Sequence, residues 1–309
     1  MSVIKVEDIA FVRFQAPDLG EIRSFLEDFG LKCVEQDGRL YAKGTDGAPF
    51  VHVTEKGEKR FVGLGFRAKS RADVEQLAAH EGLSVQTADT PGGGVFVRLT
   101  DPDGNLVDVI ADQTFGEPEP YPQETPFNSL GQRRRLRAPV RIEAAPSHVR
   151  RLGHAMIMVG NFATSAAWYK ERLGLIPSDQ VEVEPDAPIG AFMRVDRGAT
   201  PTDHHTLAMI APPDGPGFGH AAFEVDGFDD LMKGHSYLKE RKREHAWGVG
   251  RHKLGSQIFD YWRDPQGFEL EHWTDGDLHT ADDPTGTGNI EDLLGTQWGP
   301  KHPLLAGGE

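Results

Sequence analysis

The chain has a single cysteine, Cys33, among its 309 residues, which excludes an internal disulfide framework and any cysteine-rich zinc or iron–sulfur site. Long hydrophobic runs are missing as well, because no stretch reaches the roughly 18 apolar residues that a membrane span needs. Basic residues are few: 33 Lys and Arg oppose 48 Asp and Glu, giving a net charge of -15. A cationic surface for a phosphate backbone is therefore not expected. These absences predict a cytoplasmic protein with neither a nucleic-acid nor a membrane partner.

Two segments of the chain repeat one pattern. Residues 9–34 and 153–177 each predict a strand, a turn and an amphipathic helix that ends at a glycine. Residues 100–112 and 263–275 each predict a hairpin with the turn Asp-Pro-x-Gly, in which proline fixes φ and glycine accepts a positive φ. The length suits two domains of ordinary size. We therefore expect an α+β protein built from two copies of one architecture.

The boundaries follow from composition. The segment between the two copies is rich in Pro, Glu and Arg and lacks periodicity, so we interpret it as a surface connector. The C-terminal segment is again rich in Gly, Pro and Asp, with a helix-like patch near its middle. The predicted units are an N-terminal domain without metal over 1–112, a connector over 113–147, a catalytic domain over 148–275 and a tail over 276–309.

Histidine is distributed unevenly between the two copies, since eleven of 13 histidines lie at or beyond His148. The candidates for a site fall in three segments, around His154, around His220, and between His252 and Glu271. Two imidazoles and one carboxylate from separate strands are the protein half of a facial site for non-haem Fe(II), which leaves coordination positions open for a substrate and dioxygen.

Aligning the two copies on their shared motifs indicates which copy binds metal. The alignment sets three first-half residues, Phe11, Gly63 and Asp108, opposite His154, His220 and Glu271. Phenylalanine and glycine side chains cannot bind iron. We therefore expect only the second copy to carry a metal ion.

The second copy also contains a longer motif made of His252, Tyr261, Asp264, Pro265, Gly267 and Glu271. On these residues the chain resembles, over nearly its whole length, the type I extradiol (meta-cleaving) catechol dioxygenases of the vicinal oxygen chelate superfamily. The resemblance implies two tandem vicinal oxygen chelate domains, each a pair of βαβββ modules forming a half-open barrel, and a homo-oligomer. One departure is Asp260, where the family usually has an aliphatic or aromatic residue.

The resemblance implies that His154, His220 and Glu271 are the metal ligands and that the cofactor is Fe(II). Mn(II) is an alternative, because two imidazoles and a carboxylate discriminate poorly between the two metals. Glu269 competes with Glu271, since strand alternation puts both side chains on one face. The spacing from Gly267 in the turn favours Glu271.

The resemblance further implies three catalytic residues. His205 is the acid-base residue, because it directly precedes a threonine; a near-neutral pKa suits histidine to that task. His204 is the alternative, although strand alternation would turn it to the opposite face. His252 would hydrogen-bond the substrate and bound oxygen species, and Tyr261 the ionised catechol oxygen.

Four residues are predicted to line the substrate pocket. Met156 and Leu254 each lie two residues beyond an active-site histidine and should face the same cavity. Phe192 and Trp247 are candidate walls, although aromatic residues in such positions are more often core. We expect three further second-copy histidines to be structural or exposed: His235, His245 and His272.

The predicted function is that of an Fe(II)-dependent extradiol dioxygenase, which opens the ring of a catecholic substrate with O2 in aromatic-compound degradation. One alternative is ring cleavage of a trihydroxylated aromatic or another activity of the superfamily, such as a non-oxidative isomerase. An isomerase would require a further carboxylate ligand from the first copy, which Phe11 and Gly63 cannot supply. The other alternative is a non-catalytic aromatic-ligand binding protein, which requires the three ligands to be accidental.

Overall fold

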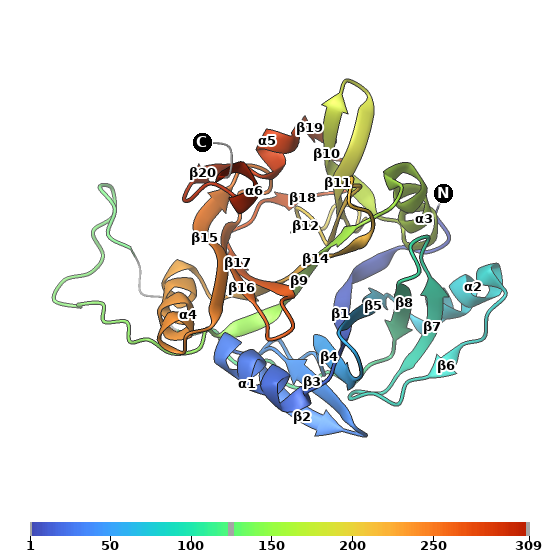
Figure 1. Ribbon diagram of the computed structural model, residues 1–309, viewed down its shortest axis with the longest axis horizontal. Helices are drawn as coiled ribbons and strands as arrows, with labels where there is room; N and C mark the ends of the chain where they lie inside the picture. The colour runs from blue at the N-terminus through green and yellow to red at the C-terminus, as the bar shows by residue number, and fades with distance from the viewer. Residues whose placement is uncertain (1, 123–126, 307–309) are drawn as a thin grey trace.

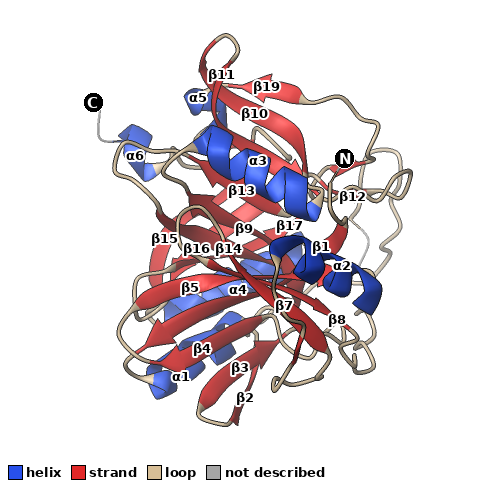
Figure 2. Cartoon of the chain, turned by 90° about the vertical axis from the view of Figure 1, so that its right-hand side faces the viewer, coloured by secondary structure: helices blue, strands red, loops and turns tan. Residues whose placement is uncertain are grey.

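The computed structural model describes residues 2–122 and 127–306, which form two large β-sheets with helices on their outer faces (Figures 1 and 2). The first sheet has eight strands and carries helices α1 (Leu19–Phe29) and α2 (Arg71–Glu81). Its strands are β1 (Val6–Ala16), β2 (Lys32–Gln36), β3 (Arg39–Lys43), β4 (His52–Lys56), β5 (Arg60–Ala68), β6 (Gln86–Thr87), β7 (Val95–Thr100) and β8 (Leu106–Ala111).

The second sheet has ten strands and carries helices α3 (Phe162–Leu173) and α4 (Phe228–Glu240). Its main strands are β9 (Val149–Met158), β10 (Ile176–Glu184), β11 (Ala187–Arg194), β13 (Leu207–Ile210), β14 (Gly217–Val225), β15 (Glu244–His252), β16 (Ile258–Arg263) and β17 (Glu269–Thr274). A separate two-stranded sheet pairs β12 (Thr202–Asp203) with β18 (Leu278–His279).

The strand order of the first sheet is β2-β3-β4-β1-β5-β8-β7-β6, and the second sheet repeats it as β10-β11-β13-β9-β14-β17-β16-β15. Each half of a sheet is one module of a strand, a helix and three strands. The two modules meet along the antiparallel pairs β1–β5 and β9–β14. The expected α+β class and the tandem pairs of βαβββ modules are therefore confirmed.

Local sequence signals explain how the first helix of each domain is bounded. The Asp18 side chain caps α1 by accepting hydrogen bonds from the backbone N–H groups of Gly20 and Glu21. Gly30 ends this helix at a φ of 109°, which lies in the region that favours glycine. In the second domain Asn161 caps α3 and Gly174 ends it. These four residues fix the same strand-to-helix connection in both domains.

The two domains pack together through an aromatic cluster. Phe14 and Phe61 of the first domain contact Phe218 and Phe268 of the second, with a ring-centroid distance of 4.5 Å between Phe61 and Phe218 and 4.9 Å between Phe14 and Phe268. Phe14 is buried and the other three rings are half-buried, and aromatic pairs of this kind add to the stability that area burial alone provides. The cluster therefore holds the two sheets in one orientation.

The C-terminal tail continues the second sheet. Its strand β19 (Gly286–Gly288) pairs with β10 at one edge, and β20 (Thr296–Trp298) pairs with β15 at the other. The short helices α5 (Ile290–Leu293) and α6 (Pro303–Ala306) lie in the same segment. The structure thus joins this segment to the second sheet, whereas the predicted boundary at residue 275 places it outside the second domain.

The described part of the connector runs mostly without helix or strand and projects from the body at the left of Figure 1. Its side chains Phe127, Leu130 and Leu136 are 67 to 95% exposed. Among the described residues, no helix has the length and apolar character needed to cross a membrane.

Candidate active site

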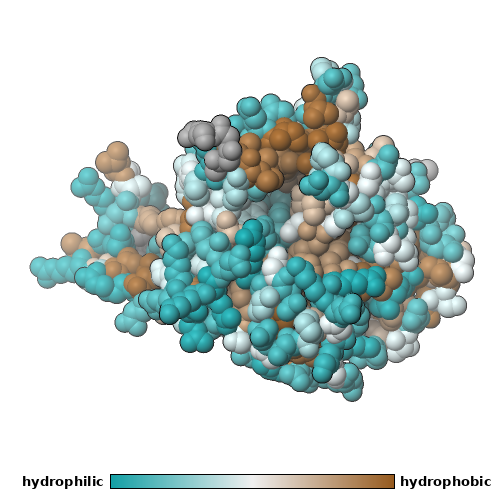
Figure 3. Space-filling model, viewed as in Figure 1, coloured by the Kyte–Doolittle hydropathy of each residue, from teal (hydrophilic) through white to brown (hydrophobic). Residues whose placement is uncertain are grey.

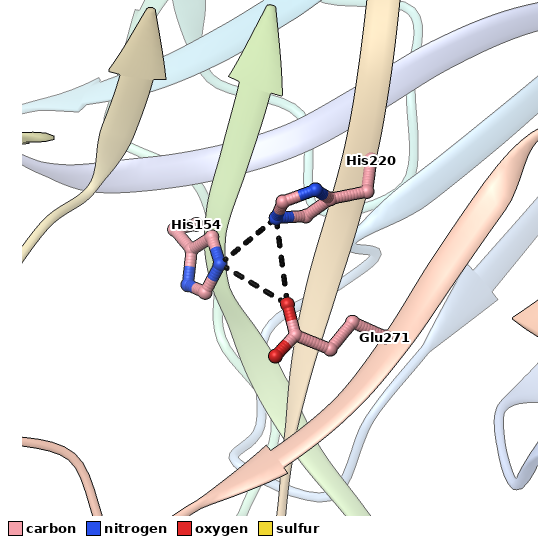
Figure 4. A group of neighbouring side chains, drawn as sticks. All are labelled: His154, His220 and Glu271. Atoms are coloured by element: carbon pink, nitrogen blue, oxygen red, sulfur yellow. Dashed lines mark hydrogen bonds and ion pairs between the residues drawn. The ribbon is translucent and has the colours of Figure 1, made fainter. Parts of the chain in front are cut away.

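The three predicted ligands converge inside the second barrel (Figure 4). His154 comes from β9, His220 from β14 and Glu271 from β17, three strands that lie side by side in the sheet. The Nε2 atoms of the two histidines are 3.3 Å apart, and each lies 3.4 Å from Oε2 of Glu271. Metal–ligand bonds of about 2.0–2.2 Å place neighbouring donors roughly 3.0–3.5 Å apart. The three atoms thus form a triangle of the size that one metal ion requires.

The chemistry of the donors also fits a metal ion. Glu271 is 0% exposed, yet neither of its carboxylate oxygens has a hydrogen-bond partner among the described residues. A buried carboxylate that approaches imidazoles without a hydrogen bond of normal geometry is unfavourable, and a cation at this point would satisfy it. Burial opposes the charged form of Glu271, but the imidazoles of His154 and His252 hold its pKa below the usual range. Burial lowers the pKa of His220 to about 3, which keeps that imidazole in the neutral, ligating form.

Strand register supports the alignment of the two domains. In the second sheet His154 pairs with Ala222, and Ala222 pairs with Glu271. The equivalent residues of the first sheet are Phe11, Gly65 and Asp108, which pair in the same order. Phe11 therefore occupies the place of a ligand histidine, as the alignment indicates.

Arginines occupy the corresponding interior of the first barrel. The Asp108 carboxylate accepts hydrogen bonds from Arg13 at 2.9 Å and from Arg98 at 2.6 Å. Arg98 on β7 is the register partner of Asp108 on β8, just as Tyr261 on β16 is the register partner of Glu271 on β17 in the second domain. Guanidinium groups thus neutralise the carboxylate that corresponds to Glu271, and the described residues of this barrel include no comparable group of three metal donors.

His252 and Tyr261 lie beside the triad. His252 Nε2 is 3.1 Å from the Tyr261 hydroxyl and 3.7 Å from Oε1 of Glu271. Burial, reinforced by the Glu271 carboxylate, raises the pKa of Tyr261 well above its usual value. The phenol therefore keeps its proton and can donate it in a hydrogen bond to an anionic oxygen.

His205 and His204 occupy a turn before β13 and are not in a strand. The ring of His205 lies against that of His154, with centroids 4.0 Å apart, and faces the cavity. His204 is not among the residues that line the cavity. Its Nδ1 lies 3.0 Å from Nδ1 of His205, and its Nε2 lies 2.7 Å from the Asp179 carboxylate.

A cavity of about 120 Å³ opens at the triad. All four predicted pocket residues line it: Met156, Phe192, Trp247 and Leu254. Trp247 stacks on Tyr261 at a centroid distance of 5.4 Å, and its indole N–H donates to the backbone carbonyl of Pro300 at 2.9 Å. The side chain that stacks on Tyr261 is therefore held in place by the tail.

Nine cavity-lining residues were missed in the sequence. Five are apolar residues of β10, β11 and β13, one is Gln257, and three come from the tail: Val181, Ala191, Ala208, Met209, Ile210, Gln257, Leu293, Leu294 and His302. The Asn289 cap of α5 could have signalled the short helix, but no periodicity connects this segment to the barrel. Figure 3 shows hydrophobic residues gathered in the upper part of the face, over the region that α5 and α6 occupy in Figure 1.

The choice between the two glutamates of β17 has a geometric basis. Glu269 lines the cavity, but its Oε1 accepts a hydrogen bond from Arg263 at 3.0 Å. Glu271 approaches both ligand histidines and has no such partner. The structure therefore brings Glu271, and not Glu269, into the triad.

The chain is similar in sequence to known proteins over most of its length. Residues 151–272 match the model of the Glyoxalase/Bleomycin resistance protein/Dioxygenase superfamily. Metapyrocatechase 2 of Cupriavidus necator is 30% identical over 302 residues, which cover 96% of this chain and 90% of that protein. The iron-dependent extradiol dioxygenase of Rhodococcus jostii is 24% identical over 284 residues, covering 88% of this chain and 90% of that protein.

Solved structures share the fold. The Mn(II)-bound glyoxalase from Novosphingobium aromaticivorans aligns with a TM-score of 0.77 and 24% identity, covering 97% of this chain and 93% of that one. The 2,3-dioxygenase LapB from Pseudomonas sp. KL28 aligns with a TM-score of 0.75 and 18% identity, covering 94% of this chain and 99% of that one.

Proposed function

We propose, from the premise that this chain belongs to the extradiol dioxygenases of the vicinal oxygen chelate superfamily, that it is an Fe(II)-dependent enzyme that cleaves a catecholic ring with O2. The observation that carries the proposal is the triangle of His154, His220 and Glu271, in which a fully buried carboxylate has no hydrogen-bond partner in the described part of the chain. Two imidazoles and one carboxylate leave positions open for a chelating substrate and for dioxygen.

Fe(II), when bound, would supply the open coordination positions and the redox-active centre, and Mn(II) is the alternative ion for the same ligands. The residues around it act on protons and on orientation. Tyr261 donates a hydrogen bond from its hydroxyl to the ionised catechol oxygen, because its raised pKa keeps the phenol protonated. His252, 3.1 Å from that hydroxyl, hydrogen-bonds the same end of the substrate and the oxygen bound beside it.

His205 is the proposed acid-base residue. Its Nδ1 is engaged by His204, so Nε2 is the nitrogen left for the cavity. The Asp179 carboxylate accepts the Nε2 proton of His204, which leaves Nδ1 of neutral His204 as an acceptor for the Nδ1 proton of His205. His205 Nε2 then carries a lone pair and can take a proton from the substrate. Asp179 and His204 are positioning residues that set this tautomer.

The cavity supports a narrower substrate class. Its volume of about 120 Å³ is close to the roughly 150 Å³ of a cavity that holds benzene. Among the described residues, no lysine or arginine lines it. We therefore propose a monocyclic catechol whose substituents carry no negative charge. Turnover should be faster with catechol and methylcatechols than with a catechol that carries a carboxylate or a second ring. Faster turnover of a trihydroxybenzene would instead favour the alternative in which the substrate is a trihydroxylated aromatic.

Ligand substitution tests the site itself. His154→Ala, His220→Ala and Glu271→Gln should each abolish ring cleavage and lower the bound iron, because each removes one of three protein donors. The matched control is His80→Gln, which changes an exposed histidine of the first domain and should retain iron and activity. A His154→Ala protein with full iron content and full turnover would remove the assignment. Ligand binding without any turnover in the iron-loaded protein would favour the non-catalytic alternative.

A homo-oligomer is also proposed. The exposed apolar side chains of the connector, Phe127, Leu130 and Leu136, support it, because large apolar groups on a projecting segment are typical of interaction surfaces. Light scattering should give a mass that is a multiple of 34.0 kDa, and substitution of Leu130 and Leu136 by serine should lower it.

A further inference from the structure

A second cluster of two histidines and one carboxylate lies outside the catalytic cavity. Its members are His235 on α4, His245 on β15 and Asp260 on β16. Neighbouring residues of a strand point to opposite faces, so Asp260 faces α4 while Tyr261 faces the cavity. The donor atoms of the three residues all lie within 4.8 Å of one another. The resemblance drew attention to Asp260 only as a departure from the family's usual residue.

The geometry of this cluster suits one ion. His245 Nε2 lies 2.8 Å from Oδ1 of Asp260, and His235 Nδ1 lies 3.1 Å from the same oxygen. Neighbouring donors on bonds of about 2.0–2.2 Å to one ion lie roughly 3.0–3.5 Å apart, so the His235 distance matches that spacing and the His245 distance is slightly shorter. The indole N–H of Trp262 donates to the other oxygen, Oδ2, at 2.6 Å and fixes the carboxylate plane. An outer hydrogen bond of this kind commonly orients a metal-binding carboxylate.

Charge also points to a cation at this position. Asp260 is 0% exposed, and its ion pairs within the described residues are with His235 and His245 only. Burial disfavours its charged form, but the hydrogen bonds from the two histidines bring its pKa below the usual value. If both imidazoles are neutral, the cluster holds one uncompensated negative charge in a buried position, which is costly. A proton on one imidazole or a bound metal ion would supply the compensating positive charge.

We propose that His235, His245 and Asp260 form a second metal site, selective for borderline divalent ions such as Zn²⁺, in which the ion replaces the imidazole protons. Two imidazoles with a single carboxylate disfavour Ca²⁺ and Mg²⁺, which prefer oxygen ligands. The side chains of His245 and His235 are 25% and 12% exposed, so an ion has a path from solvent. The bound ion ties α4 to the strand pair β15–β16, which also carries His252 and Tyr261.

Zinc stoichiometry of the metal-free full-length chain tests this site separately from the catalytic one. After equilibrium dialysis against Zn²⁺, the wild type should bind two ions per chain. His245→Gln should bind one, Glu271→Gln should bind one, and the double variant none. His80→Gln removes an exposed histidine that pairs with Glu81 at 2.9 Å and has no third donor in its group, so it should still bind two. Circular dichroism confirms that each variant is folded.

The outcomes separate the two sites. A wild type that binds one Zn²⁺, lost in Glu271→Gln and kept in His245→Gln, would show that the second cluster is only a hydrogen-bonded triad and would overturn the proposal. Loss of an ion in His245→Gln but not in Glu271→Gln would support the second site and contradict the catalytic one. If His245→Gln does not fold, His235→Gln decides, because it removes the donor on α4 and leaves the strand pair β15–β16 unchanged. Zinc should also raise the Tm of the Glu271→Gln chain but not that of the double variant.

Discussion

His52 in the first domain should make the protein sensitive to mild acid. Its side chain lies on β4, is 1% exposed and stacks on Phe14 with a ring-centroid distance of 5.0 Å. Neither ring nitrogen has a hydrogen-bond partner among the described residues. Burial therefore lowers the pKa of His52 from 6.5 to about 3. The folded protein holds this imidazole neutral, whereas the unfolded chain protonates it below pH 6.5.

The sign and magnitude follow from proton linkage. A histidine whose folded pKa is depressed removes stability as the pH falls below the unfolded pKa, because the unfolded state binds more protons. Between pH 7.5 and pH 5 the unfolded chain binds more protons at this histidine than the folded protein, and the difference integrated over pH is about 1.5. At about 1.4 kcal/mol per pH unit, the free energy of unfolding falls by about 2 kcal/mol.

Substitution of His52 isolates this contribution. His52→Leu and His52→Gln should both remove it, so each variant should gain about 2 kcal/mol relative to the wild type between pH 7.5 and pH 5. His52→Leu should also be more stable at pH 7.5, because it removes an unpaired buried polar group whose desolvation costs about 1–3 kcal/mol. Urea titrations at the two pH values measure these differences. A His52→Leu variant with the same advantage over the wild type at both pH values would refute the reasoning.

Other predictions concern the catalytic domain. His205→Asn should keep iron and catechol binding yet lose roughly 10²-fold or more in turnover, measured in single-turnover experiments. His204→Asn and Asp179→Asn should each lose roughly 10-fold or more through mispositioning, with partial recovery in Asp179→Glu; unchanged rates in both would remove the proposed tautomer control. Leu294→Ala should raise KM for a monocyclic catechol with little change in kcat, and a kcat loss as large as that of His205→Asn would contradict its role as a cavity wall.

Much of the architecture could be predicted from the sequence because its signals are local. The capping residues Asp18 and Asn161, the glycines that end the helices and the paired Asp-Pro-x-Gly turns each depend on a few neighbouring residues. The triad could be predicted because its three residues lie at matching positions of repeated strands. Aligning the two domains then predicted that the first copy binds no metal ion, and the structure shows arginines beside Asp108 there.

Long-range contacts could not be predicted in this way. The tail has no periodic pattern, yet Leu293, Leu294 and His302 reach the cavity because β19 and β20 join opposite edges of the sheet. The contacts of His204 with His205 and Asp179 could not be predicted either, because the two histidines lie in a turn, where strand alternation gives no orientation. The role of Asp260 depends on partners from a helix and a neighbouring strand, which a single strand pattern cannot reveal.

The most direct test of the central claim is the fate of dioxygen in the iron-loaded wild type. After anaerobic loading with Fe(II) and catechol, admission of ¹⁸O₂ should consume one O2 per ring, and both labelled atoms should appear in a ring-opened product. The Glu271→Gln chain, prepared identically, should consume none. Oxygen consumption that yields quinone and peroxide with an intact ring, or equal ring opening in Glu271→Gln, would contradict the account.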